Sequence, residues 1–291
     1  MYQPVVIMGM HRSGTGMLAR ILEDLGLFVG KEKERNHEAL FFLRINDWIL
    51  NLCGGAWDNP EVVDSLLKNK ELFEMVTSYL QKYLRSPKNQ EFLDSNQTGS
   101  FNLFSMTIPW GWKDPRNTFT LPIWLTLFPQ AKILHIVRNG VDAAASLKTR
   151  GEEELQASKL WAANANSNYL PRFVSSVSCL NLENGFKLWE TYVSKGVETL
   201  NTVNPINKME IRYEDLVSDK GELLTSLCDF AGLKVSAVEI KAALNTINPH
   251  KAFAYQSNSS LLNFYDKVKN SPMMKQYYPD EFYRKGGTKA A

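Results

Sequence analysis

The sequence predicts an α/β protein with a P-loop-like three-layer fold, in which a central parallel sheet is accompanied by a helical insertion. Short apolar runs suited to buried strands alternate with segments of helical periodicity. The first run, Val5 to Met8, breaks into a loop containing Gly9 and Gly14, and an amphipathic helix pattern follows at once. A second run, 131–137, is the clearest buried strand in the chain. Strands that alternate with helices favour a parallel sheet covered on both faces.

Length and composition agree with one folded domain. The chain has 291 residues, 44% of them hydrophobic and 22% charged, which is typical of a soluble globular protein. We expect a single domain over residues 1–291, with the helical insertion at roughly 151–203. The net charge of +2 gives no indication of nucleic-acid binding.

The cellular setting follows from what the sequence lacks. Three widely separated cysteines, Cys53, Cys179 and Cys228, have neither metal-binding spacing nor the pattern of a disulfide framework. The first predicted strand leaves no room for a signal peptide, and no segment is long and apolar enough to span a bilayer. We therefore expect a cytoplasmic protein with no membrane span.

The remaining elements are predicted from periodicity and from turn residues. Apolar runs at 107–112 and 209–211 read as further strands. Helical patterns cover 17–25, 39–52, 60–84, 141–147, much of 152–203, 223–230 and 237–244. Residues 92–105 are rich in Asn, Ser, Gly and Thr and read as a loop.

The loop after the first strand is a candidate anion site. Glycines let the backbone approach a ligand closely, and the first turn of a helix presents unpaired N–H groups. The segment GMHRSGT resembles a P-loop, but Thr15 stands where that motif has lysine, and Arg12 supplies the cation instead. An ordinary ATP or GTP site is therefore not expected.

Three basic residues follow predicted strands. They are Arg12, Lys113 and Arg138. In open parallel sheets, ligands bind outside the carboxyl ends of the strands. We therefore expect these three side chains to converge on one rim of the sheet.

Two segments together resemble the sulfotransferases that use 3′-phosphoadenosine 5′-phosphosulfate (PAPS). They are the lysine-less loop and IVRNGVDAAAS, in which Ser146 follows Arg138 by eight residues. The resemblance is nearest to the bacterial-type and tyrosylprotein branch, because cytosolic members carry a lysine where this loop has Arg12. An arginine fork and a hydroxyl suit a second, separate phosphate, which ATP lacks at its 3′ position.

The resemblance implies a role for each matching residue. The loop, through Arg12, Ser13, Gly14, Thr15 and Gly16, would bind the 5′-phosphosulfate, with His11 shaping the loop. Arg138 and Ser146 would bind the 3′-phosphate. Lys113, in Lys113-Asp114-Pro115, would contact the sulfuryl group and its bridging oxygen, and Tyr213 would lie against the adenine.

The general base is expected among Glu32, Glu34, His37 and Glu38, where tyrosylprotein members carry a glutamate. We choose Glu38, because a helix predicted to begin beside it would favour its carboxylate form. Trp57 and Trp110, both expected in loops, are candidates for an acceptor cleft.

The predicted activity is transfer of the sulfuryl group of PAPS to a hydroxyl or amine by in-line displacement, leaving 3′,5′-ADP. No metal is expected, because Arg12 and Lys113 would cover the phosphosulfate. A carbohydrate, protein tyrosine, lipid or small metabolite remains open as acceptor. The alternatives are a P-loop kinase of small molecules and a non-catalytic nucleotide-binding module.

Overall fold

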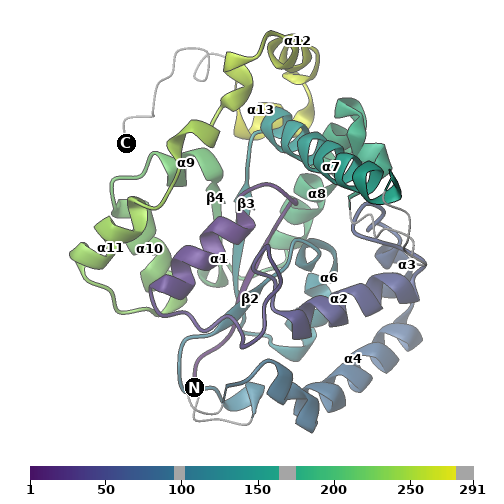
Figure 1. Ribbon diagram of the computed structural model, residues 1–291. Coiled ribbons are helices and arrows are strands. Elements are labelled where there is room, and N and C mark those ends of the chain that lie inside the picture. The colour runs from purple at the N-terminus through teal and green to yellow at the C-terminus, as the bar shows by residue number, and fades with distance from the viewer. Residues whose placement is uncertain (95–101, 164–174, 280–291) are drawn as a thin grey trace.

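Four parallel strands form the centre of the protein, in the order β2-β1-β3-β4. A computed structural model describes residues 1–94, 102–163 and 175–279 (Figure 1). The strands are β1 (Val5–Gly9), β2 (Gly111–Lys113), β3 (Lys132–Val137) and β4 (Lys208–Arg212). The predicted α/β fold with a parallel sheet is confirmed.

Alternation along β1 divides the core between the two faces of the sheet. Val5 and Ile7 pack with the apolar side of α1, whereas Val6 and Met8 pack with a cluster rich in tryptophan and phenylalanine. Successive side chains of a strand point to opposite faces, so a run that is apolar throughout needs cover on both. β1 is buried along its whole length and pairs with both β2 and β3.

Helices form the layers on both sides of this sheet. The main helices are α1 (Thr15–Asp24), α2 (Leu40–Leu52), α3 (Val63–Lys68), α4 (Lys70–Arg85), α6 (Asn117–Leu127), α7 (Gly140–Ala163), α8 (Leu182–Leu200), α9 (Tyr213–Val217), α10 (Glu222–Ala231), α11 (Ala237–Leu244), α12 (Ser259–Val268) and α13 (Pro272–Tyr277). One face packs against α1, α10 and α11, and the other against α2, α4 and α6. Figure 1 shows α1 crossing in front of the strands, with α10 and α11 beside it.

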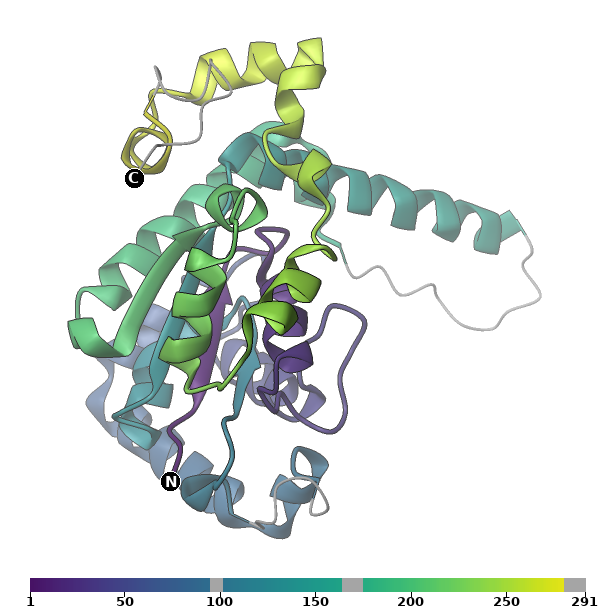
Figure 2. The same ribbon diagram turned by 90° about the vertical axis from the view of Figure 1, so that its left-hand side faces the viewer.

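Two helix predictions were wrong in their extent. The helix expected at 60–84 is broken into α3 and α4 at Asn69, whose side chain accepts a hydrogen bond from the N–H of Leu72 and so caps α4. The short helix expected at 141–147 is the first part of α7, which has 24 residues. Figure 2 shows α7 as a long rod running out from the body of the protein.

The region expected to be a helical insertion belongs to the connection between β3 and β4. It contains the second half of α7 and all of α8, while residues 164–174 lie outside the described part of the chain. Trp189, Tyr192 and Val193 of α8 are buried with α7 and with α12–α13 in a third apolar cluster. The division into one domain with an insertion stays a prediction. No helix among the described residues is long and apolar enough to cross a membrane.

Candidate functional site

A tight loop joins β1 to α1 at the carboxyl edge of the sheet. Gly9 has φ of 142°, and a Cβ there would lie 2.3 Å from the carbonyl oxygen of Ile136. Gly14 precedes α1 with φ of 92°, and no side chain caps this helix end. Arg12 also adopts a positive φ, 68°, which is uncommon for a residue with a side chain. The first N–H groups of α1 therefore face the loop without a side-chain acceptor, as an anion site requires.

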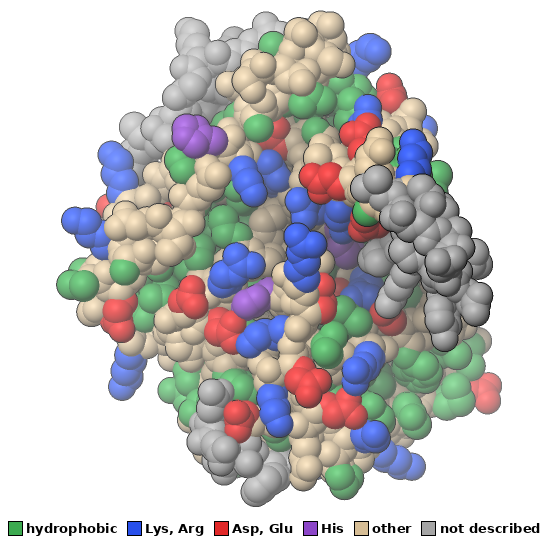
Figure 3. Space-filling view, viewed as in Figure 1, with side chains coloured by type: hydrophobic (Ala, Val, Ile, Leu, Met, Phe, Trp, Pro, Cys, Tyr) green, Lys and Arg blue, Asp and Glu red, His purple; other side chains and the backbone are tan. Residues whose placement is uncertain are grey.

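A pocket of about 610 Å³ lies over this loop. It is lined by ten of the eleven site residues expected from the sequence: His11, Arg12, Gly14, Thr15, Gly16, Glu38, Lys113, Arg138, Ser146 and Tyr213. The eleventh, Ser13, belongs to the same loop and is fully buried. Seven of the lining residues are Lys or Arg and three are Asp or Glu. Figure 3 shows Lys and Arg side chains gathered over the middle of this face.

Arg12 lies directly against Ser146. Its Nε donates a hydrogen bond to the serine Oγ at 2.9 Å, joining the loop to the second turn of α7. The sequence had placed these residues at opposite ends of the donor, Arg12 at the sulfate and Ser146 at the 3′-phosphate. The structure thus brings the two expected anion sites side by side, and their separate roles stay predictions.

Arg138 is held at the end of β3 by main-chain acceptors. Its two terminal nitrogens donate to the carbonyl oxygens of Arg12 at 3.0 Å and Lys251 at 2.7 Å. Its guanidinium lies 4.9 Å from the ring centroid of Tyr213, which itself packs against Gly14. The Nε of Arg138 is buried without a hydrogen-bond partner among the described residues. The side chain is therefore fixed in place with a donor still unused.

Lys113 and Glu38, both predicted to be catalytic, form a buried ion pair. The lysine Nζ donates to Oε1 of Glu38 and to the carbonyl oxygen of Asn36, the latter at 2.5 Å. Their side chains are 1% and 7% exposed. Lys113 comes from the end of β2 and Glu38 from the segment before α2, so residues 75 apart in sequence meet at one point.

Of the four candidates for the general base, only Glu38 lines this pocket. His37 lies 2.5 Å from Oε2 of Glu23 on α1, and Glu34 accepts hydrogen bonds from Asn36. Glu32 lines a separate surface hollow.

The expected ionisation of Glu38 was wrong. We expected the N-terminus of a helix to favour the carboxylate form of Glu38. However, α2 begins at Leu40, and Glu38 precedes the capping residue Ala39, so it lies outside the helix. Burial and a hydrogen bond with the Glu34 side chain raise the pKa of Glu38 to about 7, against the opposing charge of Lys113. Burial disfavours a charged carboxylate, and this effect outweighs the stabilising influence of the neighbouring cation.

A buried amide missed by the sequence reasoning supports the turn after Lys113. The Asn46 Nδ2 of α2 donates to Oδ2 of Asp114 and to Oδ1 of Asn117, both at 2.9 Å. Its Oδ1 accepts from Thr120 at 2.9 Å and from the Trp124 indole at 3.1 Å. Fully satisfied buried networks rigidify the elements they join. Asn46 thereby positions the β2–α6 turn, although no local motif marks it.

Glu214 was also missed, although it lies next to Tyr213. One oxygen accepts the N–H of Asn139 at 3.0 Å and the other the hydroxyl of Tyr278 at 2.7 Å. Burial raises its pKa to about 7. Glu214 thus ties the loop after β3 to the C-terminal helices.

The two tryptophans proposed for an acceptor cleft lie in different parts of the structure. Trp110 is fully buried among aromatic rings beside β2, so that prediction was wrong. Trp110 directly precedes β2, and the pairing of β2 with β1 places it in the core. Its indole N–H donates a hydrogen bond to the carbonyl oxygen of Tyr2. Trp57 lies instead beside the loop, with its ring centroid 4.8 Å from that of His11.

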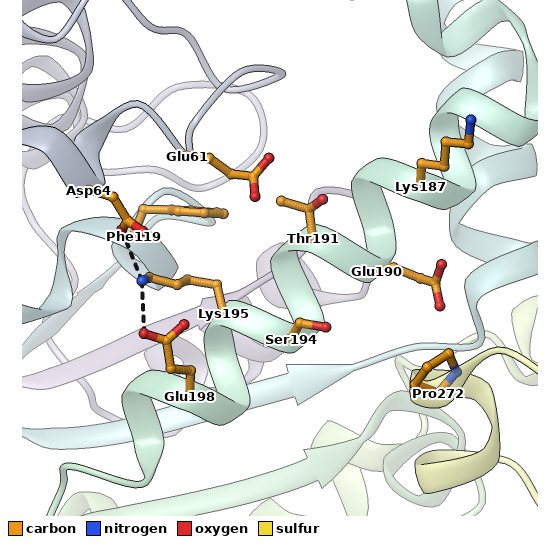
Figure 4. A pocket seen from close by; sticks show the side chains of 10 residues that line it. All are labelled: Glu61, Asp64, Phe119, Lys187, Glu190, Thr191, Ser194, Lys195, Glu198 and Pro272. Carbon is orange, nitrogen blue, oxygen red and sulfur yellow. Dashed lines mark hydrogen bonds and ion pairs between the residues drawn. The ribbon is translucent and has the colours of Figure 1, made fainter.

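A second pocket of about 510 Å³ lies along α8 and contains none of the predicted residues. Figure 4 shows Lys195 there between Asp64 and Glu198, at 2.9 and 3.1 Å. Four acidic side chains line this pocket against two lysines, Lys187 and Lys195, so it offers no comparable site for an anion. Within the described ranges, no group of three His, Cys, Asp or Glu residues is arranged to hold a metal ion.

Comparison with known proteins identifies the family. Residues 4–237 match the profile described as the sulfotransferase family. The fold is similar to that of the sulfotransferase domain from the curacin biosynthetic pathway, with 16% identity, a TM-score of 0.51 and coverage of 92% of this chain and 98% of that one.

Two further solved structures match with lower TM-scores. One is the sulfotransferase domain of the Synechococcus PCC 7002 olefin synthase, at 18% identity, a TM-score of 0.46 and coverage of 92% and 96%. Another is mouse sulfotransferase SULT7A1 complexed with PAP, at 15% identity, a TM-score of 0.46 and coverage of 94% and 86%. No curated protein matches the sequence.

Proposed function

The chain belongs to the sulfotransferase family, and from that premise we propose that PAPS is its donor and that a hydroxyl or amine accepts the sulfuryl group by in-line displacement. The observation that carries the proposal is the buried pair of Lys113 and Glu38 beside the anion-binding loop. The pair places a cation and a carboxyl group of raised pKa at the rim where three strands end. In-line transfer needs such a cation at the leaving oxygen and a base at the acceptor.

The residues present fit the donor. Buried polar atoms without a partner in the described structure include Nε of Arg138, Oγ of Ser13 and Nε2 of His11. Each belongs to a residue proposed to bind the donor. A Cβ at Gly16 would lie 2.7 Å from the carbonyl oxygen of Asn36, so the loop leaves no room for a side chain there. When bound, PAPS supplies the sulfuryl group and a phosphate leaving group.

The residues of the pocket divide into those proposed for the 3′-phosphate and adenine and those proposed for the 5′-phosphosulfate. We assign the 3′-phosphate to Arg138 and Ser146, and the adenine to the face of Tyr213. The first turn of α1, with Ser13, Gly14, Thr15 and Gly16, would hold the 5′-phosphosulfate through backbone N–H groups, with His11 shaping the loop. Arg12 would add positive charge at the 5′-phosphosulfate, although its side chain also contacts Ser146.

Lys113 would stabilise charge on the leaving oxygen, and Glu38 would take the proton of the acceptor. A carboxyl group with a pKa of about 7 is half ionised near neutral pH, which suits a general base. The cations in this scheme are side chains, and we propose a metal-independent reaction.

The kinase alternative is not favoured. Its nucleotide loop would carry a lysine where this chain has Thr15. The strands beside β1 end at Lys113 and Val137, and neither supplies an aspartate at its last residue for Mg²⁺. Asp114 follows β2, but its carboxylate is bound by Asn46 and Arg116.

We keep the cellular and partner assignments as proposals. The protein is proposed to act in the cytoplasm, without nucleic-acid partners, on a carbohydrate, protein tyrosine, lipid or small metabolite. A non-catalytic nucleotide-binding module would bind 3′,5′-ADP but transfer no sulfate.

The test combines binding with transfer. Calorimetry with 3′,5′-ADP should show binding without Mg²⁺, and ATP with Mg²⁺ should bind far more weakly. Incubation with ³⁵S-labelled PAPS and fractionated cell extract should then label an acceptor. Binding of ATP but not of 3′,5′-ADP contradicts the proposal, while 3′,5′-ADP binding without transfer to any fraction favours the non-catalytic module.

A further inference from the structure

The pocket carries more positive charge than the proposed donor site uses. Arg12, Lys113 and Arg138 are assigned to the donor. Four more cations line the same space: Arg20, Arg35, Arg150 and Lys251. Among the described residues, five of the seven Lys and Arg side chains have no ion pair, the exceptions being Lys113 and Arg138. Of the three acids in the lining, Glu38 pairs with Lys113 and Asp142 with Arg138, which leaves Glu153 to balance the other five cations among the described residues. Such an excess of like charge is unfavourable unless a ligand neutralises it.

Arg150 differs from the other surplus cations in being held in a fixed position. Its Nε donates to Oγ of Ser175 at 2.9 Å, and its guanidinium lies 5.1 Å from the ring centroid of Trp57. This ring and this hydrogen bond occupy one face and one nitrogen of the guanidinium. Its two terminal nitrogens have no acceptor among the residues that the structure describes.

Arg150 also lies close to Arg12, which is assigned to the phosphosulfate. It follows Ser146 by one turn of α7, and Ser146 contacts Arg12. Burial lowers the pKa of Arg12, and Arg150 is the strongest of the neighbouring charges that lower it further. Burial, with Arg116, Arg150, Lys113 and Arg12, likewise lowers the pKa of His11. The corner between Arg150, Trp57 and the loop is therefore strongly positive.

Resting on the proposed function, we propose that the acceptor itself carries a fixed negative group, a carboxylate, phosphate or sulfate, which Arg150 binds while Trp57 supports the guanidinium. An arginine fork suits such oxyanions because it donates two parallel hydrogen bonds. The acceptor class is then an anionic hydroxyl compound, such as an acidic sugar or an acidic phenol. A neutral sterol or a plain alcohol would leave Arg150 unpaired beside Arg12.

The test uses matched probes that differ only in charge. With the protein saturated with 3′,5′-ADP, binding is measured for 4-hydroxyphenylacetate against its amide, and for methyl glucuronide against methyl glucoside. We expect the anionic member of at least one pair to bind about tenfold more tightly. Arg150→Gln should remove this preference, Arg150→Lys should keep part of it, and the control Arg20→Gln should leave it unchanged.

Two results would overturn the inference. One is the absence of any preference for the anionic probes, whether both members of a pair bind or neither does. The other is weaker binding of PAPS or 3′,5′-ADP by Arg150→Gln, which would place Arg150 on the donor instead. Failure of the proposed function is separate from both, since it would appear as loss of 3′,5′-ADP binding in the unmodified protein.

Discussion

The cations of the pocket differ in how their charges are balanced. At its paired end Lys113 is buried against Glu38 and needs no ligand to neutralise it. Arg12, Arg150 and Arg35 line the same pocket without an ion pair among the described residues. The pair suits the proposed proton transfer, whereas bound anions would neutralise the unpaired arginines. Preorganised groups act at a transition state without reorganisation, so the paired end is where the chemistry is expected.

The largest effect is expected at the paired end. Lys113→Met should lower the turnover of sulfuryl transfer by about 10³-fold, because it removes the cation at the leaving oxygen. Steady-state formation of 3′,5′-ADP with a saturating acceptor measures this, and calorimetry of 3′,5′-ADP binding checks that the pocket is intact. Turnover within threefold of the wild type would exclude Lys113 from the chemistry.

Glu38→Gln should lower turnover by about 10²-fold, since it removes the proposed base. The pKa of Glu38 is about 7, and a base acts in its ionised form. The wild-type rate should therefore rise as pH increases through about 7 and then level off, while the variant should lack this rise. Turnover is measured for both proteins from pH 5.5 to 8.5. The same rise of turnover with pH in both proteins would mean that another residue is the base.

At the donor end, Arg138→Ala should weaken 3′,5′-ADP binding by about 30-fold, or about 2 kcal/mol, through loss of a charge-assisted hydrogen bond. Isothermal calorimetry measures the affinity, and 5′-AMP, which lacks the 3′-phosphate, serves as the control ligand. The variant should bind 5′-AMP about as well as the wild type does. Equal losses for both ligands would mean that Arg138 shapes the pocket without contacting the 3′-phosphate.

The smallest effect concerns stability rather than activity. Burial raises the pKa of Glu214 to about 7. At a pH between the ordinary pKa of a glutamate and 7, the folded protein therefore keeps a proton that the unfolded chain has released. This group therefore destabilises the wild type as pH rises from 5 to 7. Glu214→Gln should reduce that decline by about 1 kcal/mol or more, as urea unfolding at pH 5 and 8 would show. An unchanged pH dependence would mean that Glu214 ionises normally.

Much of the proposed donor site could be predicted because its signals are local. The glycines of the loop, the lysine-less motif and the strand-end positions of Lys113 and Arg138 are readable over a few residues each. Parallel strands then bring their carboxyl ends to one edge, which places these segments together without knowledge of the packing. The pocket over the loop contains ten of the eleven expected residues for this reason.

Contacts between distant segments could not be predicted in the same way. Asn46 meets Asp114 across 68 positions of sequence, and no pattern around either residue marks the pair. The four candidates for the base came from a resemblance, and Glu38 was chosen among them for an expected helix start. Its raised pKa depends instead on burial that only the packing of the 31–39 segment creates. The break at Asn69 and the length of α7 likewise follow from capping and packing rather than from periodicity.

The sequence by itself determined the parallel α/β fold, the glycine loop after β1 and the family, because apolar periodicity and short motifs act over neighbouring residues. Only the tertiary structure decided which charges meet. It paired Lys113 with Glu38, placed Arg12 against Ser146 and left Arg150 unpaired on Trp57 among the described residues. Electrostatic energies depend on distance and burial in the folded state, and neither quantity can be read from positions along the chain.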